Sequence, residues 1–159
     1  MQATCPSPEL SAVDTPAQMP EAAPAPGRPI QVLMVEDDPE AAELVQNCLN
    51  QDGTERFCVE WQDTLHAAME RIAGEGIDVV LLDLGMPDLS GAKSYLAVAI
   101  AAKDSLPIVI YTGNENAATR DLTLEFGAAD YLVKQKCSPA QLRQALSTAV
   151  RHFRPHSRH

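Results

Sequence analysis

The sequence predicts one α/β domain in which helices cover both faces of a five-stranded parallel sheet. Two observations lead to this fold class. Short apolar runs rich in β-branched residues alternate along the chain with segments of helical spacing, an order that favours parallel strands joined by crossover helices. The apolar runs are also nearly continuous, which is typical of strands that are buried on both faces.

The 159 residues, of which 45% are hydrophobic, suffice for one domain with a buried core. Residues 1–29 contain seven of the 12 prolines, with alanine and serine between them, so they cannot sustain a helix or bury much apolar surface. We therefore expect a disordered leader over residues 1–29, a folded domain over residues 30–153 and a short basic tail over residues 154–159.

The expected elements follow one another in a simple alternation. The strands are expected at Ile30–Val35, Phe57–Trp61, Ile77–Leu82, Ile108–Tyr111 and Ala129–Val133. The helices between and after them are indicated by apolar stripes, which comprise Ala41, Leu44, Val45, Cys48 and Leu49; Leu65, Ala68, Met69 and Ile72; Tyr95, Leu96, Ala99 and Ile100; a weak stripe around Leu122 and Phe126; and Leu142, Ala145, Leu146, Ala149, Val150 and Phe153. The last helix opens with the capping-box pattern Ser138-Pro139-Ala140-Gln141. A doubly wound sheet of this size predicts the flavodoxin-like strand order 2-1-3-4-5.

Polar side chains occupy the carboxyl ends of the strands, where open α/β sheets bind their ligands. Glu36, Asp37 and Asp38 follow the first strand, Asp83 follows the third, Thr112 ends the fourth and Lys134 ends the fifth. The second strand should lie at the sheet edge, so Gln62 and Asp63 after it need not contribute.

The types of these residues indicate phosphoryl chemistry. Carboxylates this close together repel one another unless a cation lies among them. A set of oxygen donors without His or Cys suits Mg²⁺ better than Zn²⁺, and a lysine and a hydroxyl would bind the other oxygens of a phosphoryl group. Asp83 is then the nucleophile, because a carboxylate can form an acyl phosphate.

Three of these residues also have simpler interpretations. Asp38 precedes Pro39, and we expect it to be a helix N-cap rather than a ligand. Thr112 could end a strand or cap the fourth helix, and Lys134 could be a solvated charge. Their joint occurrence at the ends of neighbouring strands favours a shared site.

Four segments resemble the receiver domain of two-component response regulators. They are LMVEDDP (Leu33–Pro39), DVVLLDLGMPDLSG (Asp78–Gly91), PIVIYTG (Pro107–Gly113) and FGAADYLVK (Phe126–Lys134). Their order and spacing cover the whole folded part of the chain, from about Ile30 to Phe153.

The resemblance implies a phosphoacceptor signalling module that takes a phosphoryl group onto Asp83, with Mg²⁺ as cofactor, and that is not an enzyme in the ordinary sense. The implied roles are Mg²⁺ binding for Glu36, Asp37, Asp83 and the backbone carbonyl of Gly85, phosphoryl binding for Lys134 and Thr112, and switching for Thr112 and Tyr131. Asp37 with Asp38 is an alternative for the acidic pair. For Tyr131, filling space on its strand is an alternative to a switching role.

The sequence departs from the family pattern at two positions beside the site. Gln135 follows Lys134 where the family usually has a proline joined by a cis bond. A cis bond before a non-proline residue costs about 2.5–4 kcal/mol, so we expect a trans peptide and a reshaped loop. Gly113 follows Thr112 where alanine is common, and we expect a rather short-lived phosphoryl group because glycine leaves the acyl phosphate open to water.

The expected partners are proteins: a sensor histidine kinase or a phosphotransfer protein, and a separate downstream target. The net charge of -10 argues against broad nucleic-acid contacts, and the few residues after Phe153 leave no room for a DNA-binding domain. No apolar run approaches the ~20 residues of a membrane helix, and no signal peptide begins the chain, so we expect a cytoplasmic protein. The surface of the fourth helix, fifth strand and fifth helix is a candidate for a phosphorylation-dependent homodimer.

Other functions share part of this pattern. An aspartyl phosphatase usually needs a second acid two residues after the nucleophile, where this chain has Gly85. A flavodoxin-like FMN-binding protein would carry a phosphate loop rich in hydroxyls and glycine after the first strand, where this chain has three acids. A degenerate receiver that acts as a phosphorylation-independent interaction domain is the remaining alternative, and the intact Asp83, Asp37, Thr112 and Lys134 argue against it.

Overall fold

A computed structural model describes residues 28–50, 56–87, 89, 91–113 and 115–153 of the chain. The expected tail (154–159) and residues 1–27 of the expected leader lie outside the described residues. Among the helices that are described, none combines the length and the hydropathy that a membrane span requires.

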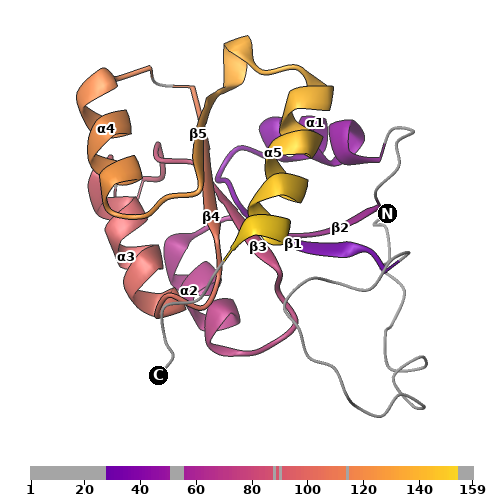
Figure 1. Ribbon diagram of the computed structural model, residues 1–159, viewed down its shortest axis with the longest axis horizontal. Helices are drawn as coiled ribbons and strands as arrows, with labels where there is room; N and C mark the ends of the chain where they lie inside the picture. The colour runs from indigo at the N-terminus through magenta and orange to yellow at the C-terminus, as the bar shows by residue number, and fades with distance from the viewer. Residues whose placement is uncertain (1–27, 51–55, 88, 90, 114, 154–159) are drawn as a thin grey trace.

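The sheet confirms the predicted class and strand order. It contains β1 (Ile30–Val35), β2 (Phe57–Gln62), β3 (Val79–Leu82), β4 (Ile108–Thr112) and β5 (Asp130–Val133). All neighbouring strands are parallel and their order is β2-β1-β3-β4-β5. β1 therefore lies between β2 and β3, and the carboxyl ends of all the strands meet at one edge of the sheet (Figure 1).

Helices cover both faces, as expected. They are α1 (Pro39–Leu49), α2 (Leu65–Ala73), α3 (Ala92–Ala102), α4 (Ala117–Glu125) and α5 (Pro139–His152), and a short 3-10 helix, η2 (Lys134–Lys136), precedes α5. Figure 1 shows α1 and α5 on one side of the sheet and α2, α3 and α4 on the other.

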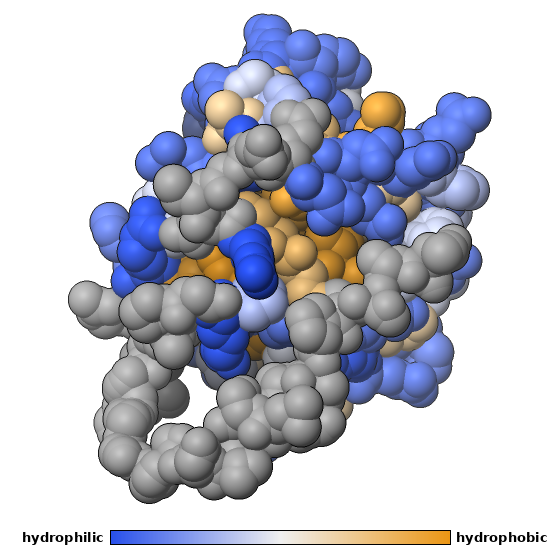
Figure 2. All heavy atoms as spheres, turned by 90° about the vertical axis from the view of Figure 1, so that its right-hand side faces the viewer, coloured by the Kyte–Doolittle hydropathy of each residue, from blue (hydrophilic) through white to orange (hydrophobic). Residues whose placement is uncertain are grey.

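Each face of the sheet has its own apolar core, which explains the continuous apolar strands. In β1, Leu33 and Val35 pack towards α2 and α3, whereas Val32 and Met34 pack towards α1 and α5. Every residue of β3 is buried. Figure 2, which faces the β2 side of the molecule, shows apolar side chains in the centre of this face between hydrophilic surfaces.

Two helix stripes are wrong in detail. Leu44 of α1 is 65% exposed and Ile100 of α3 is 75% exposed, while Ala42 and Val98 are buried. Helix α3 (AKSYLAVAIAA) is apolar around most of its circumference, so its periodicity alone cannot identify the packed face. The weak fourth stripe is also wrong, since among the buried residues of α4 only Thr123 is found within the described part of the chain.

The predicted caps are confirmed. The Ser138 hydroxyl accepts a hydrogen bond from Gln141 N at 3.1 Å, and Gln141 Oε1 accepts one from Ser138 N at 2.8 Å, which completes the capping box of α5. The Asp38 carboxylate accepts a hydrogen bond from Glu40 N at 3.1 Å at the start of α1. Asp38 is therefore a cap, and its oxygen is used within the helix turn.

Replacing Leu146 of α5 with alanine should lower the free energy of unfolding by about 2–5 kcal/mol, because its side chain is fully buried against the sheet. Leu44→Ala on α1 is the matched control, and its effect should stay within about 0.5 kcal/mol because Leu44 is exposed. Urea denaturation of both variants measures the difference. Equal losses in the two variants would contradict the assignment of the core.

Candidate functional site

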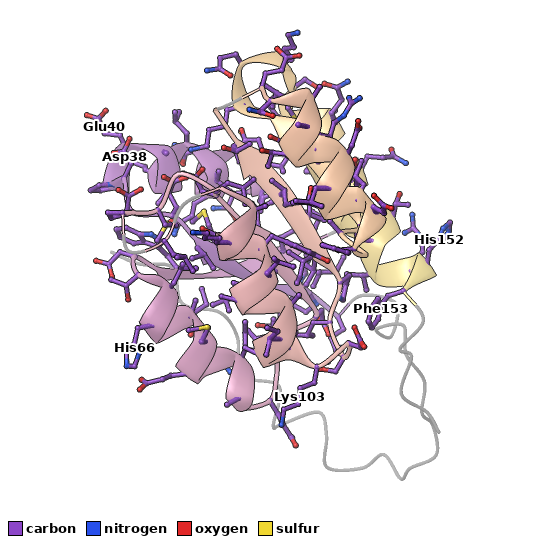
Figure 3. The ribbon with its side chains drawn as sticks, turned by 90° about the vertical axis from the view of Figure 1, so that its left-hand side faces the viewer. Asp38, Glu40, His66, Lys103, His152 and Phe153 are labelled. Atoms are coloured by element: carbon purple, nitrogen blue, oxygen red, sulfur yellow. The ribbon has the colours of Figure 1, made fainter. Side chains whose placement is uncertain are left out.

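The candidate site lies at the carboxyl edge of the sheet, where β1, β3, β4 and β5 end. Figure 3 shows Asp38 and Glu40 together at the start of α1, at the opposite end of the molecule from Lys103, which follows α3. Three carboxylates meet at this edge: Glu36, Asp37 and Asp83 each offer an oxygen, and these oxygens lie within 4.8 Å of one another.

The three carboxylates differ in burial. Glu36 is 3% exposed and Asp83 is 8% exposed, whereas Asp37 is exposed. Glu36 follows the last residue of β1, and Asp83 follows the last residue of β3 and donates its backbone N–H to Val35 O at 3.1 Å. The parallel pairing of β1 with β3 therefore fixes the two buried acids side by side.

Lys134 contacts both buried acids. Its ammonium donates to Glu36 Oε1 at 2.7 Å and lies 3.4 Å from Asp83 Oδ2. Lys134 begins the turn after β5, at the same edge of the sheet. The alternative of a solvated charge is therefore wrong for Lys134.

The carboxylate of Asp83 is held in one orientation. Oδ1 accepts a hydrogen bond from Gly85 N at 3.0 Å, while Oδ2 faces Lys134. Gly85 lies close to both oxygens, since a Cβ added there would be 3.6 Å from Oδ1 and 3.9 Å from Oδ2. A side chain at this position would therefore be in van der Waals contact with the carboxylate.

Burial and charge shift two pKa values in the site. Burial raises the pKa of Glu36 above 4.5, the negative charge of Asp83 raises it further, and the hydrogen bond from Lys134 opposes the rise. Burial lowers the pKa of Lys134, but the hydrogen bond to Glu36 and the charge of Asp83 outweigh this effect and raise the pKa above its ordinary value. Lys134 therefore stays charged throughout the physiological pH range.

The two expected switch residues are both buried beside the site. Thr112 is the last residue of β4 and pairs with Val133, the neighbour of Lys134. It ends its strand and does not cap α4, since Asn116 is the N-cap of that helix. The ring of Tyr131 packs with the core on the α2 and α3 face. Burial raises the pKa of its hydroxyl, and a hydrogen bond with the backbone of Asn116 acts in the opposite direction.

The turn after β5 connects the acidic cluster to the loop between β4 and α4. The Lys134–Gln135 peptide is trans, as predicted, and the loop forms η2. The Gln135 side-chain amide donates to Gly113 O at 3.4 Å, and Lys136 Nζ forms an ion pair with Glu115 at 3.0 Å. Three consecutive residues thus contact the acidic cluster and two positions of the β4–α4 loop.

The end of β2 contacts the site through the backbone of Glu36. The Trp61 indole N–H donates to the backbone carbonyl of Glu36 at 2.6 Å, and Glu36 N donates to Gln62 O at 3.1 Å. Both contacts are made to the backbone of Glu36 and involve no side chain that could bind a ligand. A tryptophan at the end of an edge strand gives no sequence signal for such a contact.

The donor set fits a hard divalent cation. All three potential ligands are carboxylates, two of them are buried, and Asp37 opens the group towards solvent. Among the described residues no histidine or cysteine belongs to this group, so the donors suit Mg²⁺ better than Zn²⁺. The direction of the Gly85 carbonyl stays a prediction.

Comparison with known families gives a clear match. The profile of the response regulator receiver domain matches residues 32–147. The transcriptional regulatory protein AruR of Pseudomonas aeruginosa is 29% identical over 126 residues, which cover 78% of this chain and 50% of AruR. The sensor protein GacS of Pseudomonas syringae is 35% identical over 127 residues, which cover 77% of this chain and 14% of GacS. The chain thus spans half or less of these relatives' length.

Solved structures show the same fold. The receiver domain of the putative response regulator NarL from Mycobacterium tuberculosis has a TM-score of 0.66 and 25% identity, and the match covers 78% of this chain and 98% of that domain. A CheY-like receiver domain protein from Methanospirillum hungatei has a TM-score of 0.67 and 21% identity, covering 79% of this chain and 96% of that one.

Replacing Glu36 with glutamine should remove a pH dependence of stability in EDTA. Because the pKa of Glu36 is raised in the folded state, the folded chain binds more protons than the unfolded chain between about pH 4.5 and the folded-state pKa. The free energy of unfolding should therefore fall as the pH rises through the folded-state pKa, by at most about 1.4 kcal/mol per pH unit for one proton. Urea denaturation of the wild type and Glu36→Gln at several pH values measures this slope.

The exposed Glu43 of α1 provides the control, since Glu43→Gln makes the same change of charge outside the site. The wild-type slope should persist in Glu43→Gln and become shallower in Glu36→Gln. An unchanged slope in Glu36→Gln would show that the protonation of Glu36 does not differ between the folded and unfolded states.

Proposed function

The chain belongs to the response regulator receiver domain family, and we propose that it accepts a phosphoryl group on Asp83 with the help of Mg²⁺ held by Glu36, Asp37 and Asp83. Receiver domains are signalling modules of two-component systems, and the proposed donor is a phosphohistidine on a sensor kinase or phosphotransfer protein. The observation that carries the proposal is the contact of Lys134 with Asp83 inside the acidic cluster, at the edge where phosphoryl oxygens would need a cation.

The proposed reaction is an in-line transfer. A carboxylate oxygen of Asp83 attacks the phosphorus, the bond from phosphorus to the donor's imidazole nitrogen breaks, and an acyl phosphate forms. When bound, Mg²⁺ would supply charge neutralisation for the transferring group and the acidic cluster. Lys134 lies 3.4 Å from Asp83 Oδ2 and would bind an oxygen of the transferred phosphoryl group. This new contact would weaken the hydrogen bond of Lys134 to Glu36.

The proposed signal passes from the phosphoryl group to a protein surface. Thr112 is the last residue of β4 and pairs with Val133 of β5, the residue before Lys134. Because the β4–α4 loop begins directly after Thr112, movement of its hydroxyl towards the phosphoryl group would act on that loop. Tyr131, which neighbours Asn116 at the start of α4, would follow this movement. The surface of α4, β5 and α5 is the proposed output surface for a downstream protein or a homodimer, and Leu122, Leu124 and Phe126 are exposed there.

Incubation with acetyl phosphate and Mg²⁺ should add one phosphoryl group to the wild type, measured by intact mass. Asp83→Asn should abolish the gain, because it removes the nucleophilic carboxylate. Asp38→Asn at the start of α1 is the matched control: asparagine is also a good N-cap, so this variant should fold and be phosphorylated like the wild type.

Two results would contradict this prediction. A gain that persists in Asp83→Asn would place the phosphoryl group on another residue. No gain in the wild type, either from acetyl phosphate or from a histidine kinase, would favour the alternative of a receiver that signals without phosphate.

Replacing Gly113 with alanine should lengthen the life of the phosphoryl group. A Cβ at Gly113 would meet only Gln135 Nε2, at 3.6 Å, which is an ordinary contact, so the methyl group fits and shields the loop beside Thr112 from water. We expect hydrolysis to slow by roughly threefold to tenfold, which corresponds to about 0.7–1.4 kcal/mol in the barrier. The decay of the phosphorylated mass after removal of acetyl phosphate measures the lifetime.

Gly74→Ala at the end of α2 is the control, since its Cβ would meet only Arg71, at 3.5 Å. This variant should keep the wild-type lifetime. Equal lifetimes in the wild type and Gly113→Ala would show that access of water past residue 113 does not limit hydrolysis.

A further inference from the structure

The end of the edge strand β2 holds both backbone groups of Glu36. The Trp61 indole N–H donates to Glu36 O at 2.6 Å, and Glu36 N–H donates to Gln62 O at 3.1 Å. Trp61 is 36% exposed, so its ring lies at the surface of the β2 side while its N–H is directed inwards.

Glu36 needs an anchor of this kind because it lies just beyond the regular sheet. The pairing of β1 with both β2 and β3 ends at Val35, so the carbonyl of Glu36 lies past the last paired residue on either side. The residues that follow, Asp37 and Asp38, are exposed and lead directly into α1. Since strand pairing ends one residue earlier, the indole N–H is the hydrogen-bond donor to the Glu36 carbonyl.

The position of this carbonyl matters because the side chain of the same residue is buried in the acidic cluster. Glu36 Oε1 accepts from Lys134 at 2.7 Å, and Oε2 accepts from Asp38 N at 3.3 Å. A displacement of the backbone at Glu36 would carry the Cα–Cβ bond with it and move the carboxylate relative to Asp83 and Asp37. Sub-ångström placement of ligands is what a cation with strict octahedral geometry requires.

We propose that Trp61 is a positioning residue of the cation site: its indole N–H fixes the Glu36 peptide and thereby presents the Glu36 carboxylate to Mg²⁺. This inference rests on the proposed function, because it assumes that Mg²⁺ binds to Glu36, Asp37 and Asp83. In many metal sites, a hydrogen bond to a ligating side chain fixes the orientation of that side chain. Here the hydrogen bond is made to the backbone of the ligating residue instead.

The test uses the fact that Trp61 is the only tryptophan of the chain. Biosynthetic replacement of tryptophan by 3-benzothienylalanine, in which sulfur takes the place of N–H, therefore changes one site and keeps the two-ring shape. Replacement by 5-fluorotryptophan keeps the N–H and is the matched control. Isothermal titration of the full chain with Mg²⁺ gives the Kd of each form, and thermal unfolding in EDTA shows that each form is folded.

We expect the benzothienyl form to bind Mg²⁺ about threefold to tenfold more weakly than the natural protein, the range set by the loss of one neutral hydrogen bond. The 5-fluorotryptophan form should bind like the natural protein. This rescue would not follow from a role of the ring in packing alone, since both analogues preserve the ring.

Three results would overturn the inference, and they can be told apart. Equal Kd values in all three forms, or equal weakening by both analogues, would refute the role of the N–H and leave the proposed function intact. No Mg²⁺ binding by the natural protein would refute the proposed function, and the inference would fall with it.

Discussion

The contact of Lys134 with Glu36 and Asp83 is the interaction on which the rest of the site depends. Two carboxylates that are almost wholly buried beside each other would repel strongly, and the ammonium at 2.7 Å and 3.4 Å compensates for this repulsion. The same cation makes the site responsive, because any new charge near Asp83 competes with Glu36 for Lys134. Burial and the charge of Asp83 still raise the pKa of Glu36, and a bound divalent cation would lower it.

The residues behind this contact show how the fold serves the site. Glu36, Asp83, Thr112 and Lys134 each lie at or just after the end of a parallel strand, and backbone hydrogen bonds from Glu36 N to Gln62 O and from Asp83 N to Val35 O hold the two buried acids at the edge of the sheet. Trp61 and Gln62 extend this support to Glu36 from the edge strand. The turn from Lys134 to Lys136 then links the rigid edge to the β4–α4 loop through Gln135 and Lys136. Lys134, which contacts Asp83, is followed directly by Gln135, which contacts that loop. A change in charge at Asp83 therefore acts on a residue adjacent to the loop contacts.

The sequence predicted the sheet and the meeting of the polar residues because both follow from topology. Parallel strands bring their carboxyl ends together, so Glu36 and Lys134 could be placed side by side although 98 positions separate them. Packing details were harder to foresee. Ile100 is exposed on a helix that is apolar nearly all round, and the apolar pattern does not say which side faces the sheet. The Trp61 contact escaped prediction because it joins a side chain to a backbone carbonyl, and every residue has such a carbonyl.

During biosynthesis, the two buried acids of the site are made before the lysine that contacts them. Glu36 and Asp83 leave the ribosome well before Lys134, which lies 51 positions after Asp83. Chains are made from the N-terminus at about 5–20 residues per second, so the nascent chain holds two acids without their cation until β5 joins the sheet. Docking of β5 therefore brings the ammonium of Lys134 to the two acids. A truncated or stalled chain that ends before Lys134 therefore lacks the ammonium that contacts Glu36 and Asp83 in the folded domain.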